Sequence, residues 1–409
     1  MLESIKVVDL TRALAGPTCT QLMAGMGAEV IKVEPPGGDF TRIFAHLKDG
    51  YSGYFLQRNH DKKSVCIDLR EEAGREIVRE LVAVSDVVVE NYRAGVMKRL
   101  GLAFDDLVRI NPNIVMCSIS GYGQEGRYSA RSAGDHAIQA STGLMWMTGE
   151  ADGPPTWGGS AYTDIGAGLH AFGAICAALL RLQRTGRGEW IDVALFDCAF
   201  WQHEFAVEQA LLSQGTSEPK RMGNRRLGAS PSGVYRARDG YAALVISTDA
   251  GWGILAGAIG RPELGQDPRF ATHDARWAHA DEVDALIEGW MAGVDSVDEV
   301  VTILADRFGL PCAKVMTVTE ALDDEYVRER GLLAEVEDRV LGKATVQRAP
   351  VRFASGNRTP VASAPLLGEH TGAVLRDMLG YSQERVLELL GDGVIEVDGR
   401  VLDEVVGGA

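Results

Sequence analysis

A single carboxylate, Asp164, lies in an otherwise uncharged stretch of this sequence. Residues 156–180 read TWGGSAYTDIGAGLHAFGAICAALL, and no other side chain there carries a formal charge. Glycines on both sides allow another backbone or a ligand to approach closely, and no neighbouring basic residue is available to pair with the acid. Asp164 either caps the helix that follows, where the helix dipole favours an acid, or is a reactive group in an apolar setting. The sequence pattern leaves both interpretations open.

A second set of candidate residues is basic and lies near the ends of predicted strands. Taken singly, each is typical of a solvated surface charge. Together they are informative, because the carboxyl ends of parallel strands meet at one edge of an open α/β sheet, where such sheets bind ligands. We therefore expect them to line a site for a phosphate-bearing cofactor. They are Arg42, Lys62, Lys63, Arg70, Arg93 and Arg99.

Several other kinds of site are not supported. The six cysteines are scattered, without a C-x-x-C pair or a neighbouring histidine at metal-ligand spacing, so we expect reduced thiols and no metal. The chain lacks the G-x-S-x-G elbow of many serine hydrolases. No G-x-G-x-x-G follows the first strand, which disfavours a dinucleotide. His136 is a candidate general acid or base, although a structural histidine is the simpler interpretation.

Composition restricts the partners of this 409-residue chain. Its 41 basic and 57 acidic side chains give a formal charge of −16, which argues against nucleic acid or an anionic membrane as partner. The N-terminus, MLESIKVVDL, lacks the pattern of a signal peptide. The longest apolar stretch, residues 165–180, is shorter than the roughly 20 residues that span a bilayer. We expect a cytoplasmic protein in which this stretch is a buried helix.

The elements that must position these residues alternate between strands and helices. This alternation predicts βαβ units and an α/β fold whose large domain is a doubly wound parallel sheet of Rossmann-like type. Pro17 is expected at the first position of its helix, and a helix N-terminus directly after a strand is an anion site. We expect strands over 5–10, 28–34, 63–69, 86–91, 113–120 and 190–196, and helices over 17–26, 71–84, 94–109 and 164–184.

The second half of the chain predicts a smaller α+β domain. A hairpin with an Asp239-Gly240 turn is expected over 233–248, followed by helices over 250–307. We expect the chain to be organised in four segments. They are the first part of the large domain over 1–200, a linker over 201–230, the small domain over 231–325, and a linker and C-terminal segment over 326–409 that returns to the large domain.

Stretches in the same order over nearly the whole chain resemble the family III CoA-transferases of CaiB/BaiF type. This superfamily includes formyl-CoA transferase, carnitine CoA-transferase and 2-methylacyl-CoA racemase. The stretches include VVDLTRALAGPTCTQLMAGMGAEVIKVEPPGGD, ENYRAGVMKRLGL, DHAIQASTGLMWMTG and APLLGEHTGAVLRDMLGY. The resemblance implies an interlocked homodimer that takes an acyl-CoA donor and a small carboxylic acid acceptor.

The resemblance also implies roles for individual residues. The family's catalytic aspartate stands at the start of the helix before RTGRGEW, which is the position of Asp164. CoA contacts are implied in the first turn, after the third and fourth strands, and in the loop over 131–135. These contacts are Leu14, Ala15, Arg70, Asn91, Tyr92, Arg93, Arg99, Ser132 and Asp135.

A carboxylate nucleophile suits the chemistry that this resemblance implies. A serine would hold the acyl group as a low-energy ester, whereas an aspartate forms a mixed anhydride that stays activated. The CoA thiolate then attacks the aspartyl carbonyl to give an aspartyl-CoA thioester, and the acceptor acid reverses the sequence. Such intermediates hydrolyse readily, so we expect a dry pocket with backbone N–H donors.

Two alternatives to CoA transfer remain. A 2-methylacyl-CoA racemase places a histidine directly before an aspartate, whereas this chain has Gly134-Asp135-His136, so the base is missing unless His136 reaches the substrate. The other alternative is a non-catalytic CoA-binding protein. Within the transferases, Gly134 and the lack of a clear glycine-rich loop over 224–233 disfavour oxalate and formate, and they leave room for a dicarboxylate or a hydroxy acid.

Overall fold

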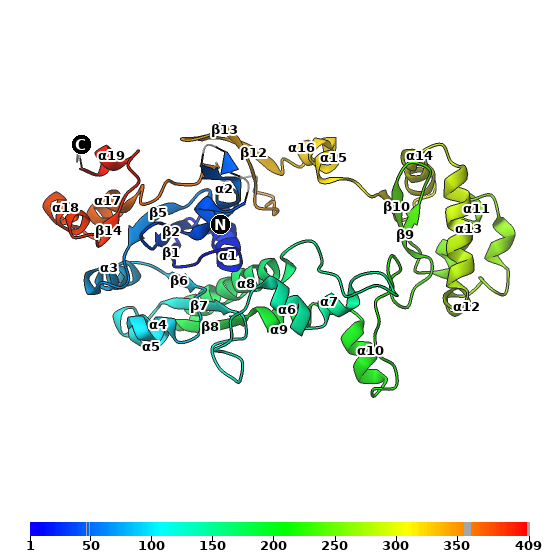
Figure 1. The fold of residues 1–409 in the computed structure, drawn as a ribbon, viewed down its shortest axis with the longest axis horizontal. Coiled ribbons are helices and arrows are strands. Elements are labelled where there is room, and N and C mark those ends of the chain that lie inside the picture. Colours follow the sequence, from blue (N-terminus) through cyan, green and yellow to red (C-terminus); the bar gives the residue numbers. More distant parts are fainter. Residues whose placement is uncertain (46, 49, 356–360, 407–409) are drawn as a thin grey trace. The chain divides into compact units, whose positions relative to one another are not determined.

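The computed structural model describes residues 1–45, 47–48, 50–355 and 361–406 (Figure 1). The chain divides into two compact units. Unit 1 comprises Met1–Thr142, Gly159–Gln202 and Tyr326–Ala409, and unit 2 comprises Gly143–Gly158 and His203–Glu325. Both Asp164 and the residues that the resemblance assigns to CoA belong to unit 1.

Unit 1 is built on a seven-stranded sheet with the order β14-β5-β2-β1-β6-β7-β8. All neighbouring pairs are parallel except the edge strand β14, which runs antiparallel to β5. The six parallel strands, numbered along the chain, lie in the order 3-2-1-4-5-6, so the order reverses between β1 and β6. The strands are β1 (Lys6–Asp9), β2 (Glu29–Glu34), β5 (Lys63–Ile67), β6 (Val87–Glu90), β7 (Val115–Ser120), β8 (Glu189–Ala194) and β14 (Ile395–Glu396).

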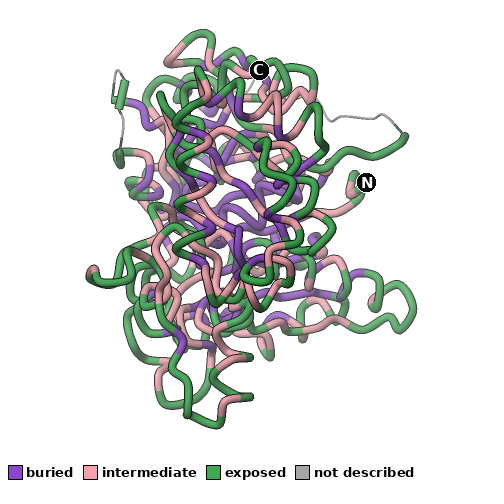
Figure 2. The backbone as a smooth tube through the Cα atoms, turned by 90° about the vertical axis from the view of Figure 1, so that its right-hand side faces the viewer, coloured by how far each residue is buried: buried purple, intermediate pink, exposed green. Residues whose placement is uncertain are grey.

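Helices cover both faces of this sheet. On one face, α3 (Glu72–Ala83), α5 (Phe104–Ile110) and α18 (Gln383–Gly391) bury apolar side chains against alternate strand residues such as Val8 and Ile31. On the other face, α1 (Ala15–Gly25) packs against β1 and β2, and α8 (Tyr162–Thr185) packs against β7 and β8. This arrangement follows from the strands, because successive side chains point to opposite faces and both faces are apolar. Figure 2 shows these buried stretches flanked by exposed chain.

Two predicted helices differ from the structure. α1 begins at Ala15, so Pro17 is the third residue of the helix and not the first. The helix predicted over 94–109 is two helices, α4 (Val96–Leu100) and α5, because Gly101 has a φ of 66° and ends the first one. A left-handed residue at this position closes a helix, and glycine adopts it without steric cost.

α8 is buried on one side only, which corrects the prediction of a buried helix. Gly166, Gly168 and Ile175 are buried, whereas Leu169 and Leu180 are 49% and 51% exposed. By length and composition α8 could cross a membrane, but it packs against α1, α9 and two strands, as a core helix does. Gly186, at a φ of 64°, ends the helix as predicted.

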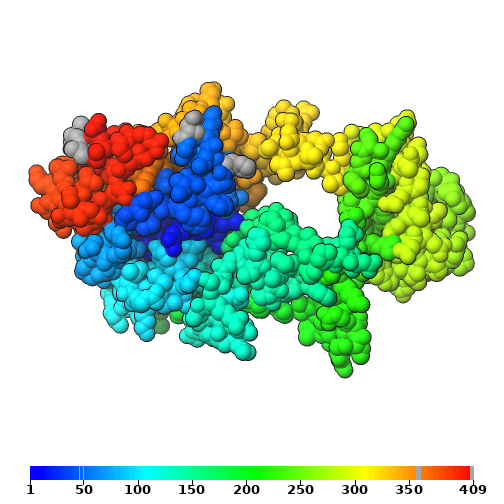
Figure 3. All heavy atoms as spheres, viewed as in Figure 1, coloured from blue at the N-terminus to red at the C-terminus, as the bar shows by residue number. Residues whose placement is uncertain are grey.

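The C-terminal segment returns to the N-terminal strands of unit 1. β14 pairs with β5, and the Tyr51 hydroxyl donates to the Ala364 carbonyl oxygen at 3.2 Å. Figure 3 shows the C-terminal residues, orange to red, packed against the N-terminal ones in blue. The other elements of unit 1 are η1 (Phe40–Ile43), β3 (Leu47–Lys48), β4 (Tyr51–Ser52), α2 (Gly53–Asn59), α6 (Asp135–Ser141), α9 (Leu195–Trp201), α16 (Glu325–Glu329, which begins at the last residue of unit 2), β12 (Leu333–Asp338), β13 (Gly342–Gln347), α17 (Thr371–Ala373), η4 (Val374–Met378) and α19 (Leu402–Val406).

Unit 2 has its own core around a three-stranded antiparallel sheet, β11-β10-β9. The predicted hairpin is confirmed, with Tyr241 opposite Arg236 across the turn, and the side chains of Trp252 and Phe270 are buried beneath it. Its elements are α7 (Leu144–Met147), α10 (Ala206–Leu212), β9 (Ser232–Arg236), β10 (Tyr241–Val245), α11 (Asp249–Ala258), η2 (Pro262–Gly265), α12 (His273–Ala278), α13 (Ala280–Gly293), α14 (Val297–Val301), η3 (Thr302–Arg307), β11 (Cys312–Lys314) and α15 (Val318–Asp323).

Candidate active site

Asp164 is a partly buried acid in the first turn of α8. It is the third residue of α8, whose N-cap is Ala161 and makes no side-chain cap. Burial, with a smaller contribution from the Asp135 carboxylate, raises the pKa of Asp164 to about 6. Within the described part of the chain, no hydrogen bond or ion pair reaches its carboxylate. A helix-capping acid would accept a backbone N–H, so Asp164 does not cap α8 in the described structure.

The glycines after Asp164 serve helix packing. A Cβ on Gly166 would lie 2.0 Å from Nε2 of Gln202, and one on Gly168 would lie 2.6 Å from the carbonyl oxygen of Ala15. Real atoms do not approach so closely, so only glycine lets α8 cross the first turn of α1 at this distance. Gly168, one turn after Asp164, therefore lets α8 pack closely against the first turn of α1.

Asp135 holds the start of α6 against the start of α8. Its Oδ1 accepts hydrogen bonds from the backbone N of Thr163 at 2.9 Å and from Oγ1 of Thr163 at 2.8 Å. Its Oδ2 accepts from Nε2 of Gln139 at 2.7 Å. Asp135 thus positions the residue directly before Asp164. The next residue, His136, is exposed, and Gly134 stands where a racemase has its histidine.

The loops after β1 and β6 are tied together where the strand order reverses. Asn91 accepts a hydrogen bond from the Arg12 backbone N at 2.8 Å and donates one to the Arg12 carbonyl oxygen at 2.7 Å. The Arg12 guanidinium lies 5.3 Å from the centroid of the Tyr92 ring. Ala13 has a φ of 67°, a strained value for a residue other than glycine. Arg12 was not among the predicted site residues. Its position shortly after the first strand could have indicated that it belongs to the site.

A cavity of about 330 Å³ opens at this edge of the sheet. Of the predicted CoA contacts, Arg70 and Tyr92 line it. The Arg70 guanidinium pairs with Asp68 at 2.6 Å, but it is 81% exposed and still presents N–H groups to solvent. The cavity is lined by Arg12, Val33, Glu34, Pro35, Pro36, Asp68, Leu69, Arg70, Tyr92 and Leu100.

The remaining predicted CoA contacts do not line this cavity. Leu14 and Ala15 are buried at the start of α1. Arg93 donates a hydrogen bond to Oγ of Ser132, which joins the loop after β6 to the predicted loop over 131–135. Arg99 is exposed on α4. The structure therefore groups most of the predicted residues near the carboxyl ends of β1 and β6.

Three predicted phosphate-binding cations bind protein groups instead. Lys62 is buried and donates to Oδ2 of Asp9 at 3.1 Å, and burial lowers its pKa to about 8 despite that acid. Arg42 pairs with Glu34 at 2.6 Å, and Lys63 pairs with Glu29. Buried charges require such partners. No local pattern indicates the pair of Lys62 with Asp9, because the two residues are far apart along the chain.

Tyr54 of α2 lies within electrostatic range of Asp164. Burial raises the pKa of Tyr54, the positive charge of Arg58 opposes this, and the charges of Asp164 and Asp39 raise it further. Neither Tyr54 nor Arg58 belongs to the residues predicted from the sequence. Their helix packs against α1, which is also the helix that Gly168 of α8 contacts.

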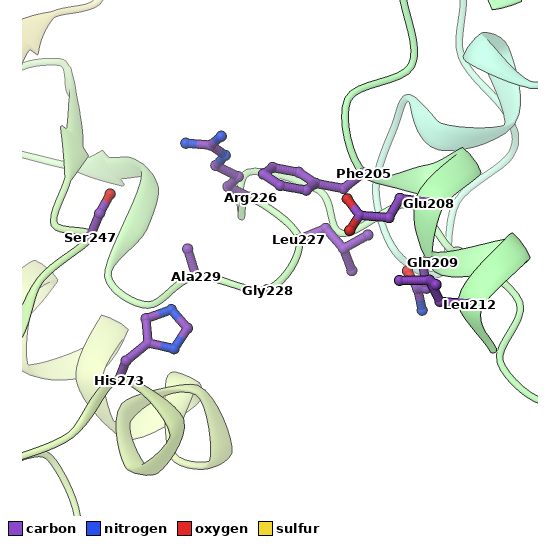
Figure 4. Close-up of a pocket in the computed structure, with 10 residues that line it drawn as sticks. All are labelled: Phe205, Glu208, Gln209, Leu212, Arg226, Leu227, Gly228, Ala229, Ser247 and His273. Carbon is purple, nitrogen blue, oxygen red and sulfur yellow. The ribbon is translucent and has the colours of Figure 1, made fainter.

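Unit 2 contains a second cavity, of about 500 Å³ (Figure 4). The loop Arg226–Ala229 lies between Phe205 and Glu208 on one side and Ser247 and His273 on the other. The Arg226 guanidinium pairs with Glu204 and lies 4.9 Å from the Phe205 ring centroid. This cavity holds none of the predicted site residues.

Metal-ligating side chains do not cluster in the described ranges. No group of three His, Cys, Asp or Glu residues there is placed to hold a metal ion. Each of the six cysteines is a free thiol.

Comparisons with known proteins place this chain in a single family. The model of "CoA-transferase family III" matches residues 2–371. The chain is 35% identical to the succinyl-CoA:glutarate CoA-transferase of Mus musculus, covering 97% of this chain and 90% of that protein. It is 35% identical to the formyl-CoA:oxalate CoA-transferase of Streptomyces coelicolor, covering 96% and 99%. A crystal structure of a CAIB/BAIF family protein from Brucella suis matches with a TM-score of 0.80 and 36% identity, covering 92% and 99%.

Proposed function

Because the chain belongs to the family III CoA-transferases, we propose that it moves CoA from an acyl-CoA donor to a small carboxylic acid with Asp164 as the covalent nucleophile. One observation supports this assignment above the others: Asp164 is a largely buried carboxylate with no hydrogen-bond or ion-pair partner among the described residues. Its pKa of about 6 leaves it mostly ionised at neutral pH. A desolvated, ionised carboxylate is a stronger nucleophile than a solvated one.

The proposed reaction proceeds through two intermediates on Asp164. The carboxylate attacks the thioester carbonyl of the donor, the C–S bond breaks, and a mixed anhydride and the CoA thiolate form. The thiolate then attacks the aspartyl carbonyl, which releases the donor acid as a carboxylate and leaves an aspartyl-CoA thioester. The acceptor carboxylate reverses these two steps, and no proton is gained or lost overall.

We propose that CoA lies at the edge of the sheet where the strand order reverses. Exposed cations surround the cavity there, and Arg12 joins the predicted Arg70, Arg93 and Arg99 in offering charge to phosphate groups. Ala15, in the first turn of α1, lies against Gly168 of α8, and Leu14 precedes it directly. The remaining proposed contacts are Asn91, Tyr92, Ser132 and Asp135, of which Asn91 and Asp135 act by holding loops in place.

We also propose that the chain acts as an interlocked homodimer in the cytoplasm. Large apolar side chains are exposed on α9 and α10, with Trp201 at 77% and Leu212 at 74%. Apolar surface of this kind is typical of an interface. Light scattering coupled to size exclusion tests the proposal, which requires twice the mass of the 44.0 kDa chain.

Substitution of the nucleophile tests the proposed function. Asp164→Ala should lower the rate of CoA transfer by at least about 1,000-fold, because alanine has no carboxylate on which the acyl group can be held. Asp152→Ala, which removes an exposed acid of unit 2, is the matched control and should retain full activity. Transfer by Asp164→Ala at the wild-type rate would show that the proposed role of Asp164 is wrong.

A further inference from the structure

We propose that Glu90 is a positioning residue for CoA: its carboxylate fixes the loop after β6 and so holds the Tyr92 ring in the wall of the cavity at the edge of the sheet. The inference rests on the proposed placement of CoA at that edge. Glu90 does not line the cavity itself, so its effect on CoA passes through Tyr92.

Glu90 is the last residue of β6, and its side chain binds the backbone two residues further on. Its Oε2 accepts a hydrogen bond from the Tyr92 backbone N at 2.7 Å. A side-chain acceptor for a nearby backbone N–H holds the chain in a local turn. The backbone N of Leu10 donates to the Val89 carbonyl oxygen at 2.8 Å, which fixes the residue before Glu90. The start of the loop is therefore held on both sides of Glu90.

The Tyr92 ring forms part of the cavity wall. It lines the cavity together with Arg12, whose guanidinium lies 5.3 Å from the centroid of the ring. The ring also packs against the apolar core of the sheet, and burial raises the pKa of its hydroxyl to about 12. A displacement of the Tyr92 backbone would therefore move an aromatic wall of the cavity and disturb the guanidinium beside it.

Glu90 is a buried acid without a cation. It is 2% exposed, and in the described ranges no ion pair reaches it. Burial raises the pKa of Glu90 to about 7, and hydrogen bonds with the Ser118 hydroxyl and the Tyr92 N–H oppose this rise. Asp9 of β1 and Glu34 of β2, which are also buried, are paired with cations. An apolar side chain in place of Glu90 would avoid the cost of burying an acid, so the acceptor for the Tyr92 N–H is what this acid contributes.

A row of polar side chains joins Glu90 to a second loop. Glu90 is opposite Ser118 in the register of β6 and β7, and Ser118 is opposite Asp192 in that of β7 and β8. The three side chains therefore lie on the same face of the sheet. Oδ2 of Asp192 accepts a hydrogen bond from the Gln124 backbone N at 2.8 Å. Each acid thus fixes one loop that carries proposed CoA contacts.

Binding of CoA itself, measured by isothermal titration calorimetry at pH 8, tests this proposal. Glu90→Leu removes the acceptor and should raise the Kd for CoA by about 10-fold, the size expected when a hydrogen bond to a charged group is lost. Glu90→Met, an apolar side chain about as long as glutamate, should give the same change. Glu90→Gln keeps an acceptor oxygen for the Tyr92 N–H and should stay within about 3-fold of the wild type.

Asp86→Ala is the matched control. Asp86 precedes the other end of β6, and its Oδ2 accepts a hydrogen bond from the Lys6 backbone N at 2.8 Å. Like Glu90, it holds a neighbouring segment of backbone at an end of this strand, but it does so away from the cavity. Asp86→Ala should therefore leave the Kd for CoA unchanged.

A double-mutant cycle tests whether Glu90 acts through the Tyr92 ring. Tyr92→Ala alone should raise the Kd for CoA by about 10-fold, because it removes one wall of the cavity. Adding Glu90→Leu to Tyr92→Ala should change the Kd by less than about 2-fold, since the ring that Glu90 positions is then absent. Fully additive effects of the two substitutions would overturn the proposal.

The same measurements separate the failure of this proposal from that of the proposed function. If the wild-type protein and Glu90→Leu bind CoA equally well, the role of Glu90 is overturned and the function stands. Equal losses of binding in Glu90→Leu, Glu90→Gln and Asp86→Ala would reflect general stability, which also overturns the proposal. A wild-type protein that neither binds CoA nor transfers it would overturn both.

Discussion

Asp9 and Asp164 are two largely buried aspartates of unit 1 that differ in their partners. Burial alone raises the pKa of Asp9, but Lys62, Lys32 and the hydroxyls of Thr11 and Thr20 together lower it to about 2. Burial also raises the pKa of Asp164, and no cation opposes it, so the value stays at about 6. The same side chain is therefore structural where polar groups surround it and chemically available where they do not. Partners, more than burial, separate the two roles.

Among the substitutions that test this comparison, removing the partner of Asp9 should change the stability of the protein most. Lys62→Met removes the cation that pairs with the buried Asp9 carboxylate and should lower the free energy of unfolding by about 3–5 kcal/mol at pH 7. Lys63→Met, which removes an exposed cation paired with Glu29, should cost less than about 1 kcal/mol. Urea denaturation of both variants checks this. Equal losses would show that the buried pair has no special role.

Neutralising Asp164 should stabilise the protein. The raised pKa means that the folded state disfavours the ionised form, so the cost grows as pH rises from the unfolded value near 3.8 through about 6 and is complete above it. Asp164→Asn should therefore raise the free energy of unfolding by about 3 kcal/mol at pH 8. The gain should be smaller at pH 5. Urea denaturation at both pH values checks it, and a loss of stability at pH 8 would contradict the account.

The contact of α8 with α1 offers a sharper test of how Asp164 is positioned. Gly168→Ala places a methyl group against the Ala15 carbonyl oxygen and should cost about 1–3 kcal/mol together with part of the activity. Gly173→Ala is the matched control in the same helix, because a Cβ there meets nothing within 4 Å. It should stabilise the protein by about 0.5–1 kcal/mol. Equal effects of the two substitutions would contradict the packing role of Gly168.

The pH dependence of the reaction should show the smallest effect. The nucleophile must be ionised, so kcat/KM should be level above pH 7 and fall about 10-fold between pH 7 and pH 5 as Asp164 is protonated. Asp9, with its pKa near 2, does not titrate in this range. A profile that stays flat down to pH 5 would show that no group with a pKa near 6 limits the reaction.

Local patterns predicted much of the fold. The alternating apolar strands and amphipathic helices identified the six parallel strands and the hairpin of unit 2, and Gly186 marked the end of α8, because these features depend on residues close in sequence. The antiparallel edge strand β14 pairs with β5 across most of the chain, and no local pattern specifies that partner. The predicted domain boundaries at 200, 230 and 325 stay predictions.

Only part of the candidate site was predicted, because contacts between distant parts of the chain leave no local pattern in the sequence. Asp164 stood out because its surroundings in the sequence lack charge. Lys62 was assigned to phosphate because its partner Asp9 lies in another strand, where only the fold brings them together.

Intact mass spectrometry of the protein mixed with an acyl-CoA donor tests the central claim most directly. The account predicts that the wild-type protein gains the mass of the acyl group or of CoA, that peptide mapping places the adduct on Asp164, and that Asp164→Ala gains neither. An unmodified wild-type protein that still transfers CoA, or an adduct on another residue, would contradict it.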